Sequence, residues 1–136
     1  MIIRLPRAGR INVHGPLSVG VPGMVAELCL ALQEFGRLTL SQVLQAAIQS
    51  ARYGFVPSRT NLNGITSNSK RWKQNFPETA RLYLKNSAPP KRNQRLTNPE
   101  LARTLEMVVT KVSLAFYRGK IAQKNVNHIQ QTSGCV

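Results

Sequence analysis

The chain has 136 residues, the size of one ordinary domain. Hydrophobic residues make up 42% and charged residues 18% of it, which allows a buried core and excludes wholesale disorder. Nineteen Lys and Arg stand against five Glu and no Asp, and the formal net charge is +14. With so few carboxylates, a catalytic site that pairs two of them is hard to assemble. Five Glu, two His and two Cys also leave few ways to assemble a catalytic or metal site.

Two helices are predicted in the first part of the chain. One follows Val21-Pro22-Gly23 and ends at Gly36, and its apolar stripe is Val25, Leu28, Leu32 and Phe35. A second begins at Thr39, which forms a capping-box pattern with Gln42, and ends at Gly54. The short link between them favours a helical hairpin in which the two apolar stripes bury each other.

The middle of the chain is more polar. Residues 55–69 predict a loop or a broken helix, and we expect helix to resume near Ser69. The spacing of Trp72 and Phe76 suits one helical face, Pro77 interrupts it, and a further short turn of helix is expected over 78–84. Residues 87–94 contain Pro89-Pro90 and two basic residues, and predict an exposed linker. We place this basic loop at about residues 86–97.

Two more helices are predicted in the last third. Asn98-Pro99-Glu100 combines an N-cap residue, a first-turn proline and an early carboxylate, and therefore starts a helix. The apolar stripe of that helix is Leu101, Leu105, Val108 and Val109. The final helix has the stripe Ile121, Ala122, Val126 and Ile129, with Gly134 as its C-terminal stop. Strand candidates are short, at 11–13 and 18–21, so the chain is expected to be mainly helical.

Targeting and redox signals are weak. Residues 1–7 break into charge and proline before an apolar stretch of signal-peptide length forms, so no export signal is expected. The longest apolar run, Leu28 to Leu32, is far shorter than the roughly 20 residues of a membrane-spanning helix. Cys29 lies among leucines and is predicted to be a buried core thiol. Cys135 lies next to the chain end, and no C-x-x-C spacing suggests a metal clip or a redox pair. The compartment stays undecided.

The residues that usually carry chemistry predict structural roles. His14 stands beside Gly15-Pro16 and is interpreted as a turn residue, and His128 falls near the apolar stripe of the last helix. The glycines form neither a P-loop nor a G-x-G-x-x-G pattern. The five glutamates lie in or next to predicted helices, where solvated or capping carboxylates are normal. They are Glu27, Glu34, Glu78, Glu100 and Glu106. We predict no catalytic, substrate-binding, cofactor-binding or metal-binding residue and no cofactor.

The positive charge is uneven, because residues 52–95 carry +9 of the total. Lys70-Arg71-Trp72-Lys73 places an aromatic residue among three cations, the kind of patch that follows a phosphate backbone while stacking a base. Arg81 and Lys85 would extend it. The same residues also suit a core aromatic beside a solvated basic face. A basic nucleic-acid-binding helical module is therefore kept as the alternative function.

Several segments, in chain order, resemble one family. They are 15–23 and 35–38, then 51–55, 76–77, 96–105 and 115–122. Their sequences are similar to S-V-x-V-P-G, F-G-R-L, A-R-E-G-F, F-P, L-x-N-P-D-L-A-R-T-L and A-F-Y-R-G-E-I-A of the gamma-glutamyltransferases, also called glutathione hydrolases. The resemblance spans roughly residues 9–134 and corresponds to an interior part of the family's large subunit.

The resemblance implies a fold and a reaction. Family members are amino-terminal nucleophile hydrolases with a four-layer αββα sandwich, in which this segment would form a helical layer against a sheet. A precursor cleaves itself, and the threonine freed at the start of the small subunit attacks the gamma-glutamyl amide of glutathione and related compounds. The implied partner is the remainder of the enzyme, including that small subunit. Members are often periplasmic, secreted or membrane-anchored.

The same comparison assigns no site residue to this chain. No Thr here is followed by His, as the threonine-threonine-histidine cleavage point requires, so the chain alone is expected to be inactive. The family's carboxylate-binding arginine lies in an R-x-x-A-P context. Arg4 and Arg7 can be compared with it, but Pro6 breaks the pattern. Tyr53 and Lys120 stand at usual Glu positions, and Ser133-Gly134 stands where Gly-Gly is common. These departures from the family pattern imply that the functional constraint on these positions is relaxed or altered in this chain.

Overall fold

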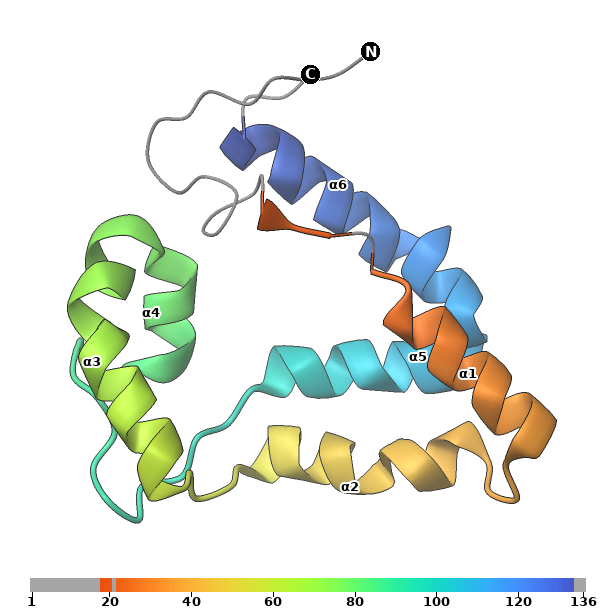
Figure 1. Ribbon diagram of the computed structural model, residues 1–136, viewed down its shortest axis with the longest axis horizontal. Coiled ribbons are helices and arrows are strands. Elements are labelled where there is room, and N and C mark those ends of the chain that lie inside the picture. The colour runs from red at the N-terminus through yellow and green to blue at the C-terminus, as the bar shows by residue number, and fades with distance from the viewer. Residues whose placement is uncertain (1–17, 21, 134–136) are drawn as a thin grey trace. The chain divides into compact units, whose positions relative to one another are not determined.

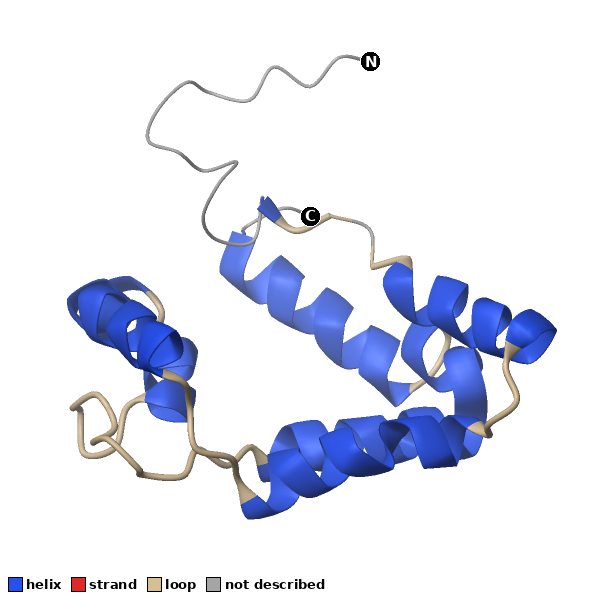
Figure 2. Cartoon of the chain, turned by 60° about the horizontal axis from the view of Figure 1, so that its bottom comes forward, coloured by secondary structure: helices blue, strands red, loops and turns tan. Residues whose placement is uncertain are grey.

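The computed structural model describes residues 18–20 and 22–133, which are mainly helical (Figures 1 and 2). The helices are α1 Met24–Phe35, α2 Leu40–Tyr53, α3 Arg59–Asn75, α4 Pro77–Tyr83, α5 Pro99–Tyr117 and α6 Lys120–Ser133. Extended pairing within the described residues is limited to two isolated bridges, Phe55 with Leu96 and Lys85 with Ala88. The predicted mainly helical class is confirmed.

The strand candidate at 18–21 does not form a strand in its described part. Ser18 lies in a 3₁₀ turn and residues 19 and 20 are irregular. The isolated bridges among the described residues lie elsewhere in the chain. The other strand candidate, at 11–13, lies outside the described residues.

The chain divides into two compact units. Unit 1 comprises residues 1–38 and 110–136, and unit 2 comprises residues 39–109. Because α1 belongs to unit 1 and α2 to unit 2, the helical hairpin of α1 and α2 stays a prediction. Helix α5 starts in unit 2 and ends in unit 1.

Unit 2 opens with the predicted capping box. The Thr39 hydroxyl accepts a hydrogen bond from the Gln42 amide at 3.3 Å, and the Gln42 side chain accepts one from the Thr39 amide at 2.8 Å. Two of the backbone donors that a helix start leaves without partners are thereby satisfied. Helix α2 then runs to Tyr53 and stops at Gly54, as its sequence pattern predicts.

Helix α3 contradicts the prediction of a loop or broken helix at 55–69. Ser58 caps it by accepting a hydrogen bond from the Asn61 amide at 3.2 Å. Hydroxyls along the helix bond back to backbone carbonyls of the preceding turn, as Thr66 does to Leu62 at 2.8 Å, so polar residues fit inside it. Tertiary burial of Ile65 stabilises a segment that its own composition disfavours.

Helices α3 and α4 pack together around a small core. Phe76 ends α3 and Pro77 takes the first position of α4, as the predicted interruption requires. Trp72 and Ala80 pack against the buried cluster of Ile65, Leu84 and Leu96. Leu96 belongs to the loop that follows α4.

The loop of residues 84–98 is built from two tight turns. Lys85 and Ala88 exchange backbone hydrogen bonds across Asn86 and Ser87, whose φ angles are both positive. A second turn closes with the Gln94 amide donating to the Lys91 carbonyl at 3.0 Å. Although the sequence predicts an exposed linker, Pro90 and Leu96 of this basic loop are buried. The loop is thus partly anchored in the unit's core.

Helix α5 begins at the predicted cap. The Asn98 side chain accepts a hydrogen bond from the Leu101 amide at 2.9 Å, and Pro99 occupies the first turn. The predicted stripe is confirmed except at Leu101. Val108 is buried and Leu105 and Val109 are half-buried, whereas Leu101 is 45% exposed. Leu101 instead lines a groove in unit 2.

Unit 1 contains α1, the end of α5 and α6. The Tyr117 hydroxyl donates a hydrogen bond to the Pro22 carbonyl and accepts one from the Ala26 amide at 3.1 Å, which joins the end of α5 to the start of α1. Phe116 packs edge-on against Tyr117 with ring centroids 5.1 Å apart. The aromatic pair therefore anchors helix ends, as its sequence position suggests. The predicted stop at Gly134 lies outside the described residues.

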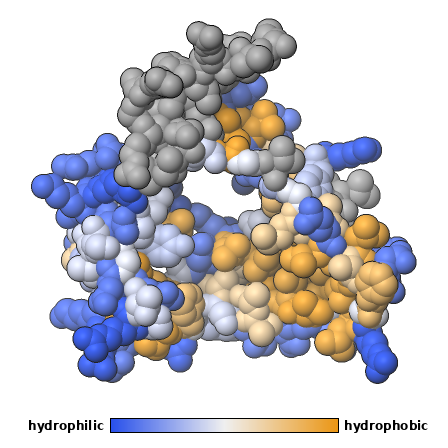
Figure 3. Space-filling view, viewed as in Figure 1, coloured by the Kyte–Doolittle hydropathy of each residue, from blue (hydrophilic) through white to orange (hydrophobic). Residues whose placement is uncertain are grey.

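One face of α1 is apolar and exposed. Met24, Leu28 and Phe35 recur at helical spacing and are 70%, 63% and 88% exposed. Figure 3 shows hydrophobic residues gathered over the region where α1 is drawn. The prediction that Leu28 and Phe35 are buried is wrong for this structure, because no described element of unit 1 covers that face. Val25 and Leu32 on the adjoining face are half-buried.

Candidate functional site

An apolar groove lies in unit 2 between the end of α2, the end of α4 and the start of α5. It has a volume of about 270 Å³. Its lining residues are Ala47, Ser50, Ala51, Phe55, Leu82, Tyr83, Leu96, Thr97, Asn98 and Leu101. We call it the α2–α4–α5 groove.

A backbone clamp holds the groove together. Phe55 and Leu96 exchange both backbone hydrogen bonds, at 2.9 and 3.1 Å, and the Asn98 amide donates to the Ala51 carbonyl at 2.7 Å. The Arg95 guanidinium donates to the Gly54 carbonyl at 2.6 Å. The residues after α2 are thereby fixed to the residues before α5. This pairing across about 40 positions of sequence carries no local signal, so sequence analysis missed it.

A second, shallower groove adjoins the first. Its volume is about 440 Å³, and Phe55, Tyr83 and Leu96 line both. Trp72 lines the second groove with its ring 5.5 Å from that of Tyr83, centroid to centroid. Trp72 is half-buried and packs on Tyr83, so it takes part in the core of unit 2 as well as lining this groove.

The carboxylates of unit 2 are all engaged by arginines. Glu106 pairs with Arg52, and Arg81 pairs with Glu78 at 2.9 Å and with Glu100 at 3.0 Å. The hydrogen bonds that the Arg81 guanidinium donates to Glu78 and to Glu100 raise the pKa of Arg81 above its ordinary value. By linkage, this raised pKa contributes stability that is retained at neutral pH and is lost as the pH rises through the pKa of Arg81.

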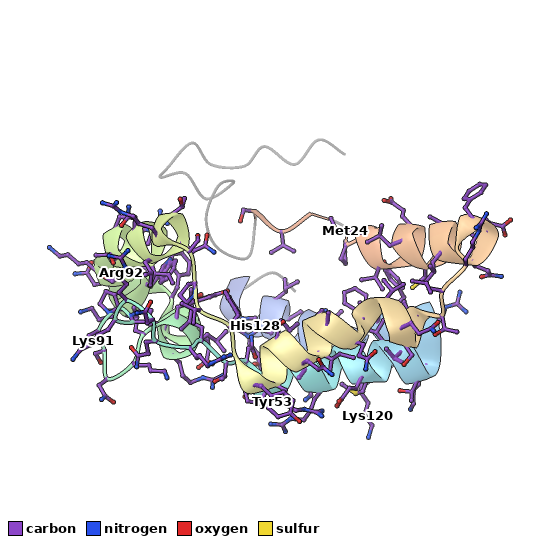
Figure 4. All side chains as sticks on the ribbon, turned by 90° about the horizontal axis from the view of Figure 1, so that it is seen from below. Met24, Tyr53, Lys91, Arg92, Lys120 and His128 are labelled. Atoms are coloured by element: carbon purple, nitrogen blue, oxygen red, sulfur yellow. The ribbon has the colours of Figure 1, made fainter. Side chains whose placement is uncertain are left out.

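Those candidate residues that the structure describes do not assemble into a reactive centre. His128 is an exposed residue of α6, and Cys29 is half-buried on α1, where a buried thiol was predicted. His14 and Cys135 lie outside the described residues. Tyr53 lies at the end of α2 and Lys120 at the start of α6 (Figure 4). Among the described residues, no histidine, cysteine or glutamate lines the α2–α4–α5 groove. Its chemistry suits binding of apolar groups.

Within the described residues, the structure shows neither a metal-binding cluster nor a membrane-spanning helix. Within residues 18–20 and 22–133, no three His, Cys, Asp or Glu side chains come together in a way that would hold a metal ion. No helix in the described part of the chain has the length and apolar character needed to cross a membrane.

The comparisons with known proteins define first the fold and then the family. The chain is similar to the crystal structure of Helicobacter pylori gamma-glutamyltranspeptidase, with a TM-score of 0.85 over 92% of this chain and 36% of that one, at 24% identity. This likeness establishes the fold: the chain is a helical segment of the amino-terminal nucleophile hydrolase fold. Residues 6–136 match the family described as gamma-glutamyltranspeptidase. The chain belongs to this family.

Other relatives agree. The chain is 29% identical over 125 residues to the glutathione hydrolase proenzyme of a Pseudomonas species and 34% identical over 113 residues to a glutathione hydrolase-like proenzyme of Bacillus subtilis. These matches cover 92% and 83% of this chain but only 22% and 21% of the relatives. The Pseudomonas nitroreducens gamma-glutamyltranspeptidase structure, a complex with L-DON, matches with a TM-score of 0.76 and 30% identity over 90% of this chain and 35% of that one. The chain therefore spans about a fifth of the length of the two curated proenzymes.

Proposed function

We propose that these 136 residues are the helical part of an enzyme that transfers or hydrolyses the gamma-glutamyl group of glutathione and related amides. The family match over residues 6–136 carries the proposal. The segment contributes structure, and the nucleophilic threonine is supplied by the remainder of the enzyme. On this proposal the segment helps to frame the substrate cleft and has no activity alone.

The exposed face of α1 supports the proposal that this segment contributes structure to a larger enzyme. Met24, Leu28 and Phe35 leave a contiguous apolar strip facing solvent on one helix, and such strips usually mark an interface. The matched segment makes up only 36% of the Helicobacter pylori chain, so most of such an enzyme is available to cover this face. We propose that α1 packs against the remainder of its own enzyme, which includes the small subunit.

The first experiment measures turnover of a gamma-glutamyl anilide by the purified 136-residue chain. We expect no release of the aniline above the uncatalysed rate, because the chain has no activated nucleophile. Turnover by this chain would overturn the inactive-segment proposal. Sequencing the genomic reading frame on both sides provides the complement. A continuation that encodes a threonine-threonine-histidine segment supports the proposal, and its product should turn over the same anilide.

The alternative, a basic nucleic-acid-binding helical module, receives no support from the family match or from the relatives. The one observation that suggests it is the charge of residues 52–95. Binding through phosphate contacts would weaken steeply as salt rises, since it releases counterions. A duplex affinity that changes little between low and physiological salt would exclude it.

A further inference from the structure

Unit 2 carries a charge that its own carboxylates do not neutralise. Residues 39–109 contain eleven Lys and Arg and three Glu, a net charge of +8. Two arginines, Arg52 and Arg81, take part in the ion pairs of all three glutamates. Lys70 and Lys73 on α3 and Lys91 on the following loop are exposed and have no carboxylate partner in the described part of the chain. Such a surface repels itself and favours an anionic partner.

These cations accompany an open apolar groove. Phe55, Tyr83 and Leu101 line the α2–α4–α5 groove and remain 46%, 41% and 45% exposed. Arg95 directly precedes the lining residue Leu96 in sequence and bonds to the Gly54 carbonyl at 2.6 Å. Lys91 and Arg92 lie on the same loop (Figure 4). The loop that lines the groove with Leu96, Thr97 and Asn98 therefore also carries several positive charges.

This combination distinguishes between classes of polyanion. A phosphate backbone gains from the cations, but it cannot occupy a groove lined mainly by Ala, Leu and aromatic side chains without losing its hydration. Trp72 is half-buried and packed on Tyr83, which limits how far a base can stack on its ring. An acidic polypeptide supplies both parts, because carboxylates match the cations while an apolar side chain fills the groove.

We propose that unit 2 docks an acidic polypeptide segment whose apolar side chain inserts into the α2–α4–α5 groove. The segment belongs to the part of the enzyme outside these 136 residues, an assignment of source that rests on the proposed function. The curated relatives are four to five times longer than the matched segment, which leaves ample chain to provide it. On this proposal, an acidic surface of the same enzyme matches the positive charge of unit 2.

The test uses the full 136-residue chain and three probes. They are a synthetic peptide of glutamates around a central leucine, the same peptide with lysines for the glutamates, and a short DNA duplex. Trp72 is the only tryptophan and its ring contacts Tyr83 of the groove, so its fluorescence reports occupancy there. We expect the acidic peptide to change Trp72 emission, with an affinity that falls as salt rises, and the lysine peptide to cause no change.

Two pairs of variants separate the groove from general charge. Leu101→Glu places a carboxylate at the groove and should weaken the acidic peptide at least about tenfold, whereas Val126→Glu, the same type of change at a site 48% exposed on α6, should leave affinity within about twofold. Replacing both Lys91 and Arg92 by Glu should weaken it similarly, and replacing both Lys120 and Lys124 should not.

Several results would overturn the proposal. They are the absence of a Trp72 response to the acidic peptide, equal losses in the test and control variants, and duplex binding that is tighter and shows the same variant pattern. Circular dichroism checks the fold of each variant. If Leu101→Glu fails to fold, the exposed-loop pair at Lys91 and Arg92 decides the question. A negative peptide result leaves the anilide and reading-frame tests of the proposed function untouched.

Discussion

A methyl group added at Gly54 is expected to lower the free energy of unfolding of unit 2 strongly. The φ of +83° and ψ of 156° of Gly54 lie in a region that is essentially restricted to glycine, and occupying it with another residue costs about 1–3 kcal/mol. A Cβ at this position would also lie 2.8 Å from the Leu96 carbonyl oxygen and 2.8 Å from a methyl of Thr97. Leu96 belongs to the clamp that holds the groove together, and Thr97 lines the groove.

Relief of that contact must move backbone, because the carbonyl of Leu96 is already bonded to Phe55. Separating the clamp weakens two backbone hydrogen bonds, each contributing about 1 kcal/mol net. Together with the conformational cost, Gly54→Ala should lower the free energy of unfolding of unit 2 by about 3 kcal/mol. The effect should also open the groove, since Phe55 and Leu96 line it.

Urea unfolding followed by Trp72 fluorescence measures this change, because the only tryptophan lies in unit 2. The matched control is Gly64→Ala on α3, where an added Cβ meets no atom within 4 Å. There the helix should gain about 0.5–1 kcal/mol. The clamp geometry is incorrect if Gly54→Ala lowers the free energy of unfolding by less than about 0.5 kcal/mol, or if both variants change it in the same direction.

Three further changes test the caps, the aromatic anchor and the ion pairs. Asn98→Ala removes the α5 cap and should cost about 1 kcal/mol in urea unfolding, and Asn98→Asp should restore most of it. Tyr117→Phe removes both hydroxyl contacts and should speed amide hydrogen exchange at Ala26, an effect whose absence would refute the anchor. A double-mutant cycle on Arg52 and Glu106, which are 43% and 40% exposed, should give a coupling below about 1 kcal/mol that shrinks in high salt.

The α1 strip and the groove surface of unit 2 are expected to bind different kinds of partner. The α1 strip of Met24, Leu28 and Phe35 is apolar, and its association should strengthen with added sulfate. The groove surface of unit 2 is cationic around an apolar centre, and its association should weaken with salt. Salt dependence therefore separates the two proposed contacts in one titration series.

The local sequence determined most helix boundaries. Thr39 with Gln42 and Asn98 with Pro99 start helices through side-chain caps, and Gly54 ends one, because these signals act within a single turn. Ordered motifs along the chain also indicated the family, which the match over residues 6–136 confirms. The absence of any assigned site residue stays a prediction.

Tertiary structure decided what local signals cannot encode. Helix α3 forms despite its polar composition because Ile65 is buried in a core shared with Leu84 and Leu96. Leu101 lines a groove although its spacing predicted a core position, because the coverage of α5 depends on which other elements pack against it. These contacts join residues distant in sequence, and their free energy depends on packing area and close approach, which helical periodicity does not specify.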